Sequence, residues 1–193
     1  MTKFKLGKRQ QRRLIQALLV LALILLGGVY SSPELRDTLS ENQPGLYEVV
    51  EVSDGDTIVV NLDDNEERVR LIGVDTPETN HPSKPVQCFG RAATQFTTHL
   101  IDGHLVRLEA DPTNSNRDRY NRLLRYVYLD DGTLVNKSII EEGYGFAYTS
   151  FPFEKKDEFI LAQSKAQAES VGLWESCEIN DLGDGRVETS AEQ

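Results

Sequence analysis

Residues 46–79 read LYEVVEVSDGDTIVVNLDDNEERVRLIGVDTPET, and this stretch decides the fold class. Three runs rich in β-branched and apolar residues, at 46–52, 57–62 and 67–74, alternate with short turns of Asp, Asn, Ser and Gly. Such runs at this spacing predict three antiparallel strands joined as a meander. Pro77 stands three residues after the end of the third run and fixes the local direction of the backbone.

The rest of the body adds two strands and three helices. Residues 104–110 and 122–129 alternate apolar and polar side chains, which predicts strands. Apolar spacing, helix-forming composition and glycine stops predict helices at residues 90–101, 133–143 and 153–172. Strands followed by helices in one domain predict an α+β fold built on a small antiparallel barrel of about five strands.

The N-terminal segment has the pattern of a membrane signal. Residues 1–13 contain six basic residues and no acidic one, and only Gln16 is polar among residues 14–30. An apolar run of this length suits a transmembrane anchor whose basic end stays in the cytoplasm. The alternative is a signal peptide that is cleaved on secretion. Either way the rest of the chain would lie outside the cytoplasm.

Length and composition limit the domain organisation. The 193 residues suffice for one domain of ordinary size and a short appendage. Only two cysteines are present, which excludes a disulfide-dense small protein and a four-thiolate metal site. We expect residues 31–45 to form a linker, residues 46–177 the folded domain, and residues 178–193 an acidic disordered tail.

The charge distribution is uneven along the chain. The net charge is −10, and residues 14–193 alone hold 15 basic and 31 acidic residues, a net charge of −16. So acidic a body argues against a nucleic-acid partner. Locally the pattern reverses, because residues 117–125 contain four arginines and one acid, Asp118. We give this local pattern more weight than the total charge.

The two cysteines, Cys88 and Cys177, flank the first and the last predicted helix. Disulfides persist outside the cytoplasm, where the membrane signal would place the domain. We favour a bond between these two residues, and the alternative is a pair of separate buried thiols.

Two carboxylates are expected to meet at one end of the predicted sheet. Asp56 lies in the turn between the first two strands, and Asp75 directly follows the third strand. In a meander the end of the third strand lies near the turn that joins the first two, so these side chains would approach each other. Carboxylates with a backbone carbonyl suit a hard cation, Ca²⁺ first. The alternative is that Asp simply favours turns.

Two arginines and a third carboxylate complete a candidate catalytic set. Arg70 lies in the third predicted strand, Arg122 begins the last one, and Glu78 follows Pro77. A guanidinium binds phosphate through paired hydrogen bonds and stays charged. Phosphodiester hydrolysis needs a base for the attacking water and positive charge beside the phosphorus oxygens, which this set and a cation would supply. Taken singly, an arginine at either position is more often part of a surface salt bridge than a phosphate ligand.

Three segments in this order resemble the thermonuclease (staphylococcal or micrococcal nuclease) family: VSDGDTIVV (52–60), VRLIGVDTPET (69–79) and DRYNRLLRYVYL (118–129). The resemblance covers about residues 46–176, including GLWES at its end. It implies a five-stranded barrel of the oligonucleotide-binding (OB) type with three helices. It also implies Ca²⁺-dependent cleavage of DNA and RNA that leaves 3′-phosphate ends.

The resemblance also assigns roles to single residues. Asp56 and Asp75 would bind Ca²⁺ together with the backbone carbonyl of Thr76. The two arginines of the catalytic set would hold the scissile phosphate and its developing charge, and Glu78 would orient or deprotonate the attacking water. Further substrate contacts are expected from Lys84, Arg119, Tyr120 and Tyr148.

Two positions depart from the family pattern. Asn121 stands where the family commonly has Gly, and Asn tolerates the left-handed backbone conformation. Ser150 stands where the best-known member has a second tyrosine, which should weaken contact with the nucleotide without affecting a catalytic role.

Two functions other than catalysis are alternatives for this sequence. A nuclease-like binding module would lack some of the metal and catalytic residues, and a structural envelope protein would leave the paired arginines unexplained. The chain keeps all five of these residues: Asp56, Arg70, Asp75, Glu78 and Arg122. The sequence therefore predicts a monomeric catalytic domain that acts as a calcium-dependent endonuclease outside the cytoplasm.

Overall fold

The computed structural model describes residues 45–79, 85–183 and 186–192. The predicted cytoplasmic end, membrane segment and nearly all of the linker lie outside these ranges, and so does Lys84. Within the described part of the chain, no helix combines the length and the apolar character needed to cross a membrane.

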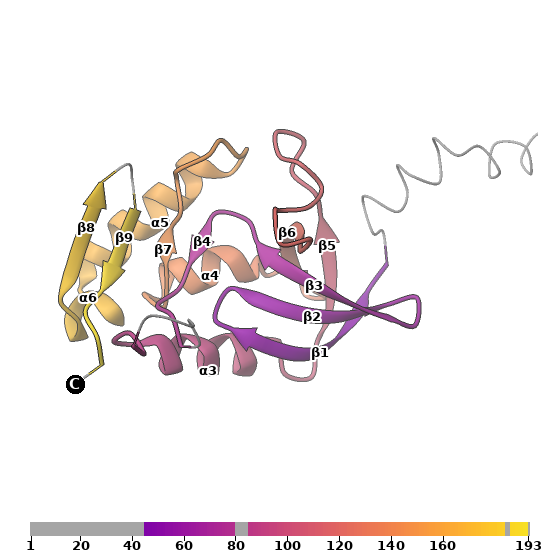
Figure 1. Cartoon of the computed structure of the whole chain (residues 1–193), viewed down its shortest axis with the longest axis horizontal. Helices are drawn as coiled ribbons and strands as arrows, with labels where there is room; N and C mark the ends of the chain where they lie inside the picture. Colours follow the sequence, from indigo (N-terminus) through magenta and orange to yellow (C-terminus); the bar gives the residue numbers. More distant parts are fainter. Residues whose placement is uncertain (1–44, 80–84, 184–185, 193) are drawn as a thin grey trace, which may run out of the picture. The chain divides into compact units, whose positions relative to one another are not determined.

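Five strands close into a barrel in the order β1-β2-β3-β6-β5 (Figure 1). They are β1 (Tyr47–Asp54), β2 (Thr57–Leu62), β3 (Asn65–Leu71), β5 (Leu105–Glu109) and β6 (Leu123–Leu129). The first three form the predicted antiparallel meander. The barrel closes through a parallel pairing of β3 with β6 and antiparallel pairings of β5 with β6 and with β1. The α+β fold and the five-stranded barrel are thereby confirmed, whereas the prediction of a fully antiparallel barrel is wrong because β3 and β6 are parallel.

The barrel interior follows from the two-residue period of its strands. Val69 and Leu71 of β3 are buried, while Arg70 between them points to the other face. The same alternation buries one side of the later barrel strands: Val106, Leu108, Val127 and Leu129. Apolar side chains thus make up most of the buried interior, although Arg125 of β6 and Thr57 of β2 are also fully buried.

The three predicted helices are present as α3 (Gly90–Ile101), α4 (Val135–Glu141) and α5 (Lys156–Glu169). A further single turn, α6 (Leu173–Ser176), follows α5. Shortly after α4 comes Gly143 at φ 71°, and a Cβ there would lie 2.3 Å from the carbonyl oxygen of Val171. Only glycine allows this close approach between the end of α4 and the segment before α6.

A short strand pair joins the segment after β3 to the segment between α4 and α5. β4 (Val74–Asp75) pairs antiparallel with β7 (Phe146–Ala147), which places Asp75 opposite Phe146. The backbone N–H of Tyr148 also donates to the carbonyl of Gly73 at 2.9 Å. These pairings fix the segment after the third barrel strand, which carries Asp75, Thr76 and Glu78 of the predicted site.

The prediction of a disordered tail at residues 178–193 is wrong for the described residues of that segment. They form an antiparallel hairpin of β8 (Ile179–Gly183) and β9 (Arg186–Thr189). Thr189 is buried, and its hydroxyl donates to the carbonyl of Cys88 at 2.8 Å. The acidic composition suggested disorder, but composition does not register backbone pairing with a distant segment. This hairpin lies beyond the predicted limit of the folded domain at residue 177.

The favoured disulfide between Cys88 and Cys177 is present, with the two Cα atoms 5.9 Å apart. It joins the segment before α3 to the segment after α6. Next to it, the N–H of Cys88 donates to the carbonyl of Ser190 and the N–H of Glu192 donates to the carbonyl of Val86, both at 2.8 Å. The hairpin is therefore held covalently at its start and by backbone hydrogen bonds at its end.

Candidate active site

The turn between β1 and β2 presses closely against the segment after β4. A Cβ on Gly55 would lie 2.8 Å from the side chain of Thr76 and 3.0 Å from Cβ of Ala93, so glycine is required here. The carboxylate of Asp56, which is 4% exposed, accepts hydrogen bonds from the N–H of Thr76 at 2.9 Å and from its hydroxyl at 3.2 Å. The two turns predicted to meet are thus in direct contact.

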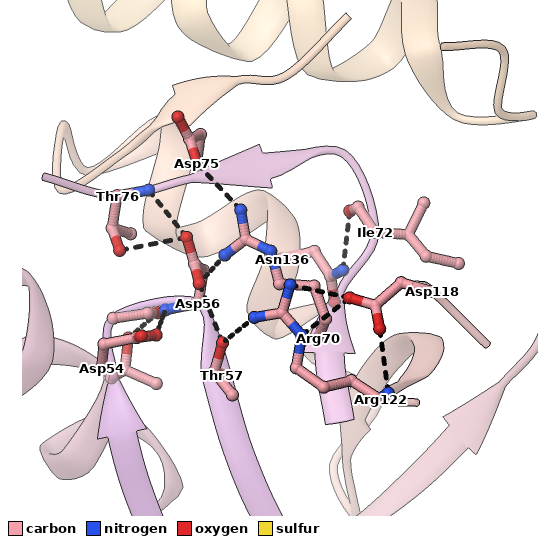
Figure 2. Close-up of polar contacts among 12 residues, drawn as sticks. Asp54, Asp56, Thr57, Arg70, Ile72, Asp75, Thr76, Asp118, Arg122 and Asn136 are labelled. Carbon is pink, nitrogen blue, oxygen red and sulfur yellow. Dashed lines mark hydrogen bonds and ion pairs between the residues drawn. The ribbon is translucent and has the colours of Figure 1, made fainter. Parts of the chain in front are cut away.

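Arg70 joins the two carboxylates of the predicted metal site (Figure 2). Its guanidinium forms an ion pair with Asp56, and its Nη2 donates to Oδ1 of Asp75 at 2.8 Å. The predicted approach of Asp56 and Asp75 is therefore confirmed, since one guanidinium contacts both. The side chains of Arg70 and Asp56 are 15% and 6% exposed and so largely shielded from water, whereas that of Asp75 is 40% exposed.

The donor atoms at this place fit a hard cation. Asp56 and Asp75 offer carboxylate oxygens, and the adjacent Thr76 offers a backbone carbonyl. Among the described residues, no group of three or more His, Cys, Asp and Glu side chains is arranged to hold a metal. Ca²⁺ takes six to eight oxygen ligands, so two carboxylates would need carbonyl, water or substrate oxygens beside them. A cation would also compete with Arg70 for the same carboxylate oxygens.

The second predicted arginine is fixed by a carboxylate of its own loop. Nε and Nη2 of Arg122 both lie 2.7 Å from Oδ2 of Asp118, while Oδ1 accepts the backbone N–H groups of Tyr120 and Arg122 at 2.9 Å. Burial raises the pKa of Asp118, but hydrogen bonds from Arg122 and Tyr120 outweigh burial and hold that pKa below its ordinary value. Asn121 has φ 65°, the left-handed conformation expected from the sequence.

Arg122 reaches the same end of the barrel as Arg70. Its Nη1 donates to the hydroxyl of Thr57 at 3.4 Å, and that hydroxyl also donates to Asp56 at 3.1 Å. Thr57 pairs with Arg70 across β2 and β3. Arg70 contacts the buried carboxylate of Asp56 directly, and Arg122 contacts it through the hydroxyl of Thr57. Both arginines are therefore positioned at the same buried carboxylate.

Glu78 is held through its backbone by Gln87, which is 6% exposed. The N–H of Glu78 donates to Oε1 of Gln87 at 2.7 Å, and the N–H of Gln87 donates to the carbonyl of Glu78 at 2.9 Å. Nε2 of Gln87 in turn donates to the carboxylate of Glu188 on β9 at 3.1 Å. The sequence did not predict a role for Gln87 or Glu188. A single buried Gln forms no recognisable motif, and Glu188 lies in the tail that was expected to be disordered.

These side chains border one cleft of about 600 Å³. It brings together most of the predicted site residues: Arg70, Asp75, Thr76, Glu78, Arg119, Tyr120, Arg122 and Tyr148. Asp56 lies behind this lining and does not border the cleft itself. Lys84 falls outside the described residues.

Aromatic side chains accompany the arginines along the cleft. The guanidinium of Arg119 lies 4.7 Å from the ring centroid of Tyr120 and donates to its hydroxyl at 2.7 Å. Tyr148 meets Phe151 edge to face, with ring centroids 5.2 Å apart. Phe151 is half-buried, packs against the core and also borders the cleft. Such rings offer stacking surfaces for bases.

Comparison with known proteins places this arrangement in a family. Residues 68–176, more than half of the chain, match the family described as staphylococcal nuclease homologue. The chain is 44% identical to the thermonuclease of Staphylococcus intermedius over 130 residues, which cover 67% of this chain and 76% of that protein. It is 39% identical to the thermonuclease of Staphylococcus hyicus over 145 residues, 75% of this chain and 84% of that protein.

A third relative comes from another genus. The chain is 37% identical to endonuclease YncB of Bacillus subtilis over 139 residues, which cover 70% of this chain and 65% of that protein. A barrel whose cleft gathers arginines and carboxylates defines the chain as a nuclease, which is a hydrolase of phosphodiester bonds. The chain belongs to the staphylococcal nuclease family.

Proposed function

We propose that this nuclease is a Ca²⁺-dependent endonuclease that cleaves DNA and RNA outside the cytoplasm and leaves 3′-phosphate ends. The observation that carries the proposal is the convergence of Arg70, Arg122 and Glu78 on one cleft. We also assign the barrel to the OB type, because its strands lie in the chain order 1-2-3-5-4 and the third and fifth are parallel.

The two arginines would bind the scissile phosphate. A guanidinium holds two phosphate oxygens at once and stays charged while negative charge builds up on them. Arg70 and Arg122 suit this role because both border the cleft and both are fixed by carboxylates, Arg70 by Asp75 and Arg122 by Asp118. A bound phosphate would add one further anionic partner to each guanidinium on the cleft side.

Glu78 would orient and deprotonate the attacking water. A bond forms between the water oxygen and phosphorus, the bond from phosphorus to O5′ breaks, and the 5′ oxygen takes up a proton. This bond order leaves the phosphate on the 3′ end. Gln87 fixes the backbone of Glu78 on both sides, so the base is positioned before substrate arrives.

Asp56, Asp75 and the carbonyl of Thr76 would hold the calcium ion. Bound there, Ca²⁺ would supply positive charge that polarises the phosphate and lowers the pKa of water. The buried Asp56 accepts two hydrogen bonds from Thr76, which keeps the carboxylate next to that backbone segment.

The disulfide supports an extracytoplasmic location, because such bonds persist where the surroundings are oxidising. Membrane anchoring through residues 14–30, or their cleavage as a signal peptide, stays a prediction from the sequence. Substrate contacts by Arg119, Tyr120 and Tyr148 are proposed because all three border the cleft. We propose the same role for Lys84 from sequence alone, and a monomeric catalytic domain.

The experiment is cleavage of single-stranded and duplex DNA and of RNA by the full chain in a mild detergent. We expect cleavage with Ca²⁺ and none with EGTA. The products should resist extension by a polymerase until a phosphatase removes their 3′-phosphates. Cleavage that persists in EGTA would refute the calcium requirement, and products that can be extended at once would refute the bond assignment.

A variant tests the role of the carboxylate. Glu78→Gln should lower kcat about 100-fold or more while the fold and calcium binding are retained. Glu66→Gln is the matched control, because Glu66 is exposed on β3 and does not border the cleft. Full activity of Glu78→Gln would eliminate the assigned role.

A further inference from the structure

The C-terminal hairpin borders the catalytic cleft, although it was expected to be disordered. Leu182 of β8 and Arg186, Val187 and Glu188 of β9 line the same cleft as Arg70 and Arg122. In Figure 1 the β8–β9 hairpin and β6 lie on either side of the short β4–β7 pair. The cleft thus has one wall from the loop before β6 and a second wall from the hairpin.

Each wall presents a cation beside an exposed apolar surface. The first wall carries Arg119 and Tyr120, whose residue surface is 64% exposed. The hairpin carries Arg186 and Leu182, which is 45% exposed. A nucleic-acid strand alternates charged phosphates with apolar base faces, so such a pair of side chains matches one nucleotide.

The charge of Arg186 is available to a ligand. Arg70 and Arg122 are paired with carboxylates, whereas Arg186 is exposed and forms no ion pair with any residue that the structure describes. The body of the chain is strongly acidic, so a cation on this surface gives local attraction for a phosphate that the total charge does not.

The hairpin is held firmly enough to act as a wall. Cys177 at its start is bonded to Cys88, and Gln87 pairs with Ala191 at its end. Glu188 accepts the hydrogen bond of Gln87, which also fixes the backbone of Glu78. The hairpin is therefore positioned relative to the catalytic carboxylate before substrate binds, which lowers the entropic cost of binding.

We propose that the β8–β9 hairpin is a second substrate-binding wall of the cleft and that Arg186 binds a phosphate of the nucleic-acid strand outside the scissile position. This inference rests on the proposed nuclease function. Arg186 then contributes to the binding of a longer strand and contributes nothing to a substrate too short to reach the hairpin.

The test compares Arg186→Gln with the unchanged full chain on a single strand of about 12 nucleotides and on a dinucleotide. We expect KM for the longer strand to rise about threefold to tenfold with kcat unchanged. KM for the dinucleotide should stay constant. The slope of log KM against log salt should become shallower by about 0.7, as for one lost phosphate contact on a single strand.

Two further variants separate this role from a general effect of charge. Arg68→Gln removes an exposed arginine of β3 that does not border the cleft, and it should leave both KM values unchanged. Arg186→Lys keeps the charge and should restore most of the affinity for the longer strand. If Arg186→Gln behaves like Arg68→Gln, or raises KM equally for both substrates, the proposal is overturned.

A binding measurement keeps the outcome separate from catalysis. Fluorescence anisotropy of the same labelled strand in EGTA gives its Kd without cleavage. If the parent protein cleaves no nucleic acid, the proposed nuclease function is refuted. A higher Kd of Arg186→Gln for the strand would still support the substrate-binding wall. Equal Kd values for Arg186→Gln and Arg68→Gln would refute the wall whether or not the chain is a nuclease.

Discussion

Removal of the disulfide between Cys88 and Cys177 should strongly destabilise the domain. The two cysteines are separated by 89 residues, so the bond restricts a long loop in the unfolded chain. The chain-entropy relation for a loop of this length gives about 15 cal/mol/K, or about 4.6 kcal/mol at 25 °C. For a domain of this size the loss corresponds to a Tm lower by about 10–18 °C.

The measurement is urea and thermal unfolding of the Cys88→Ala/Cys177→Ala double variant against the oxidised protein. The oxidised protein unfolded with a reducing agent present should match the double variant, and so should Cys88→Ala alone, because each lacks the same bond. Dissimilar results would mean that the alanines disturb packing. A loss below about 1 kcal/mol would refute the reasoning, since the unfolded chain would then not be restricted as the loop length requires.

Three further predictions concern fixed points of the fold and site. Asp118→Asn should lower kcat about 10-fold to 100-fold, because the guanidinium of Arg122 loses its carboxylate partner, and unchanged kcat would contradict this. Burial raises the pKa of Asp111, but hydrogen bonds, including one from Tyr126, outweigh burial and hold this pKa below the ordinary 3.8. The ionised Asp111 therefore stabilises the fold above pH 3.8, and this contribution to stability is lost as the pH falls below that value. Asp111→Asn should therefore destabilise the protein at pH 7, with a difference in urea midpoints that shrinks below pH 3.8, and a difference independent of pH would contradict the assignment. Gly143→Ala should lower the free energy of unfolding by about 2–4 kcal/mol, because its Cβ would lie 2.3 Å from a carbonyl oxygen at φ 71°, and a midpoint equal to that of the parent would refute the strain.

Local patterns predicted most of the barrel and helices. The helix at residues 90–101 has the predicted limits, because the apolar stripe that predicts it lies entirely within these residues. The parallel pairing of β3 with β6 was not predicted, since nothing local in either strand specifies a partner more than 50 residues away. The hairpin was missed for the same reason, because it depends on pairing with Gln87 and Cys88.

The candidate site was predictable as far as the meander determines it. The approach of Asp56 and Asp75 follows from the order of three adjacent strands and their turns. The pairing of Arg70 with both carboxylates was not predictable, because it depends on the rotamer that the arginine adopts within the folded site. The roles of Gln87 and Glu188 depend on contact between distant segments, which no motif records.

The bond between Cys88 and Cys177 also makes the chain between them a covalent ring. This ring includes the exposed loop that carries Arg119 and Tyr120. A protease that cuts once anywhere within the ring opens it, but both products of the cut stay joined through the two sulfur atoms. Wherever proteases are present, a molecule nicked within the ring would therefore keep all its parts together.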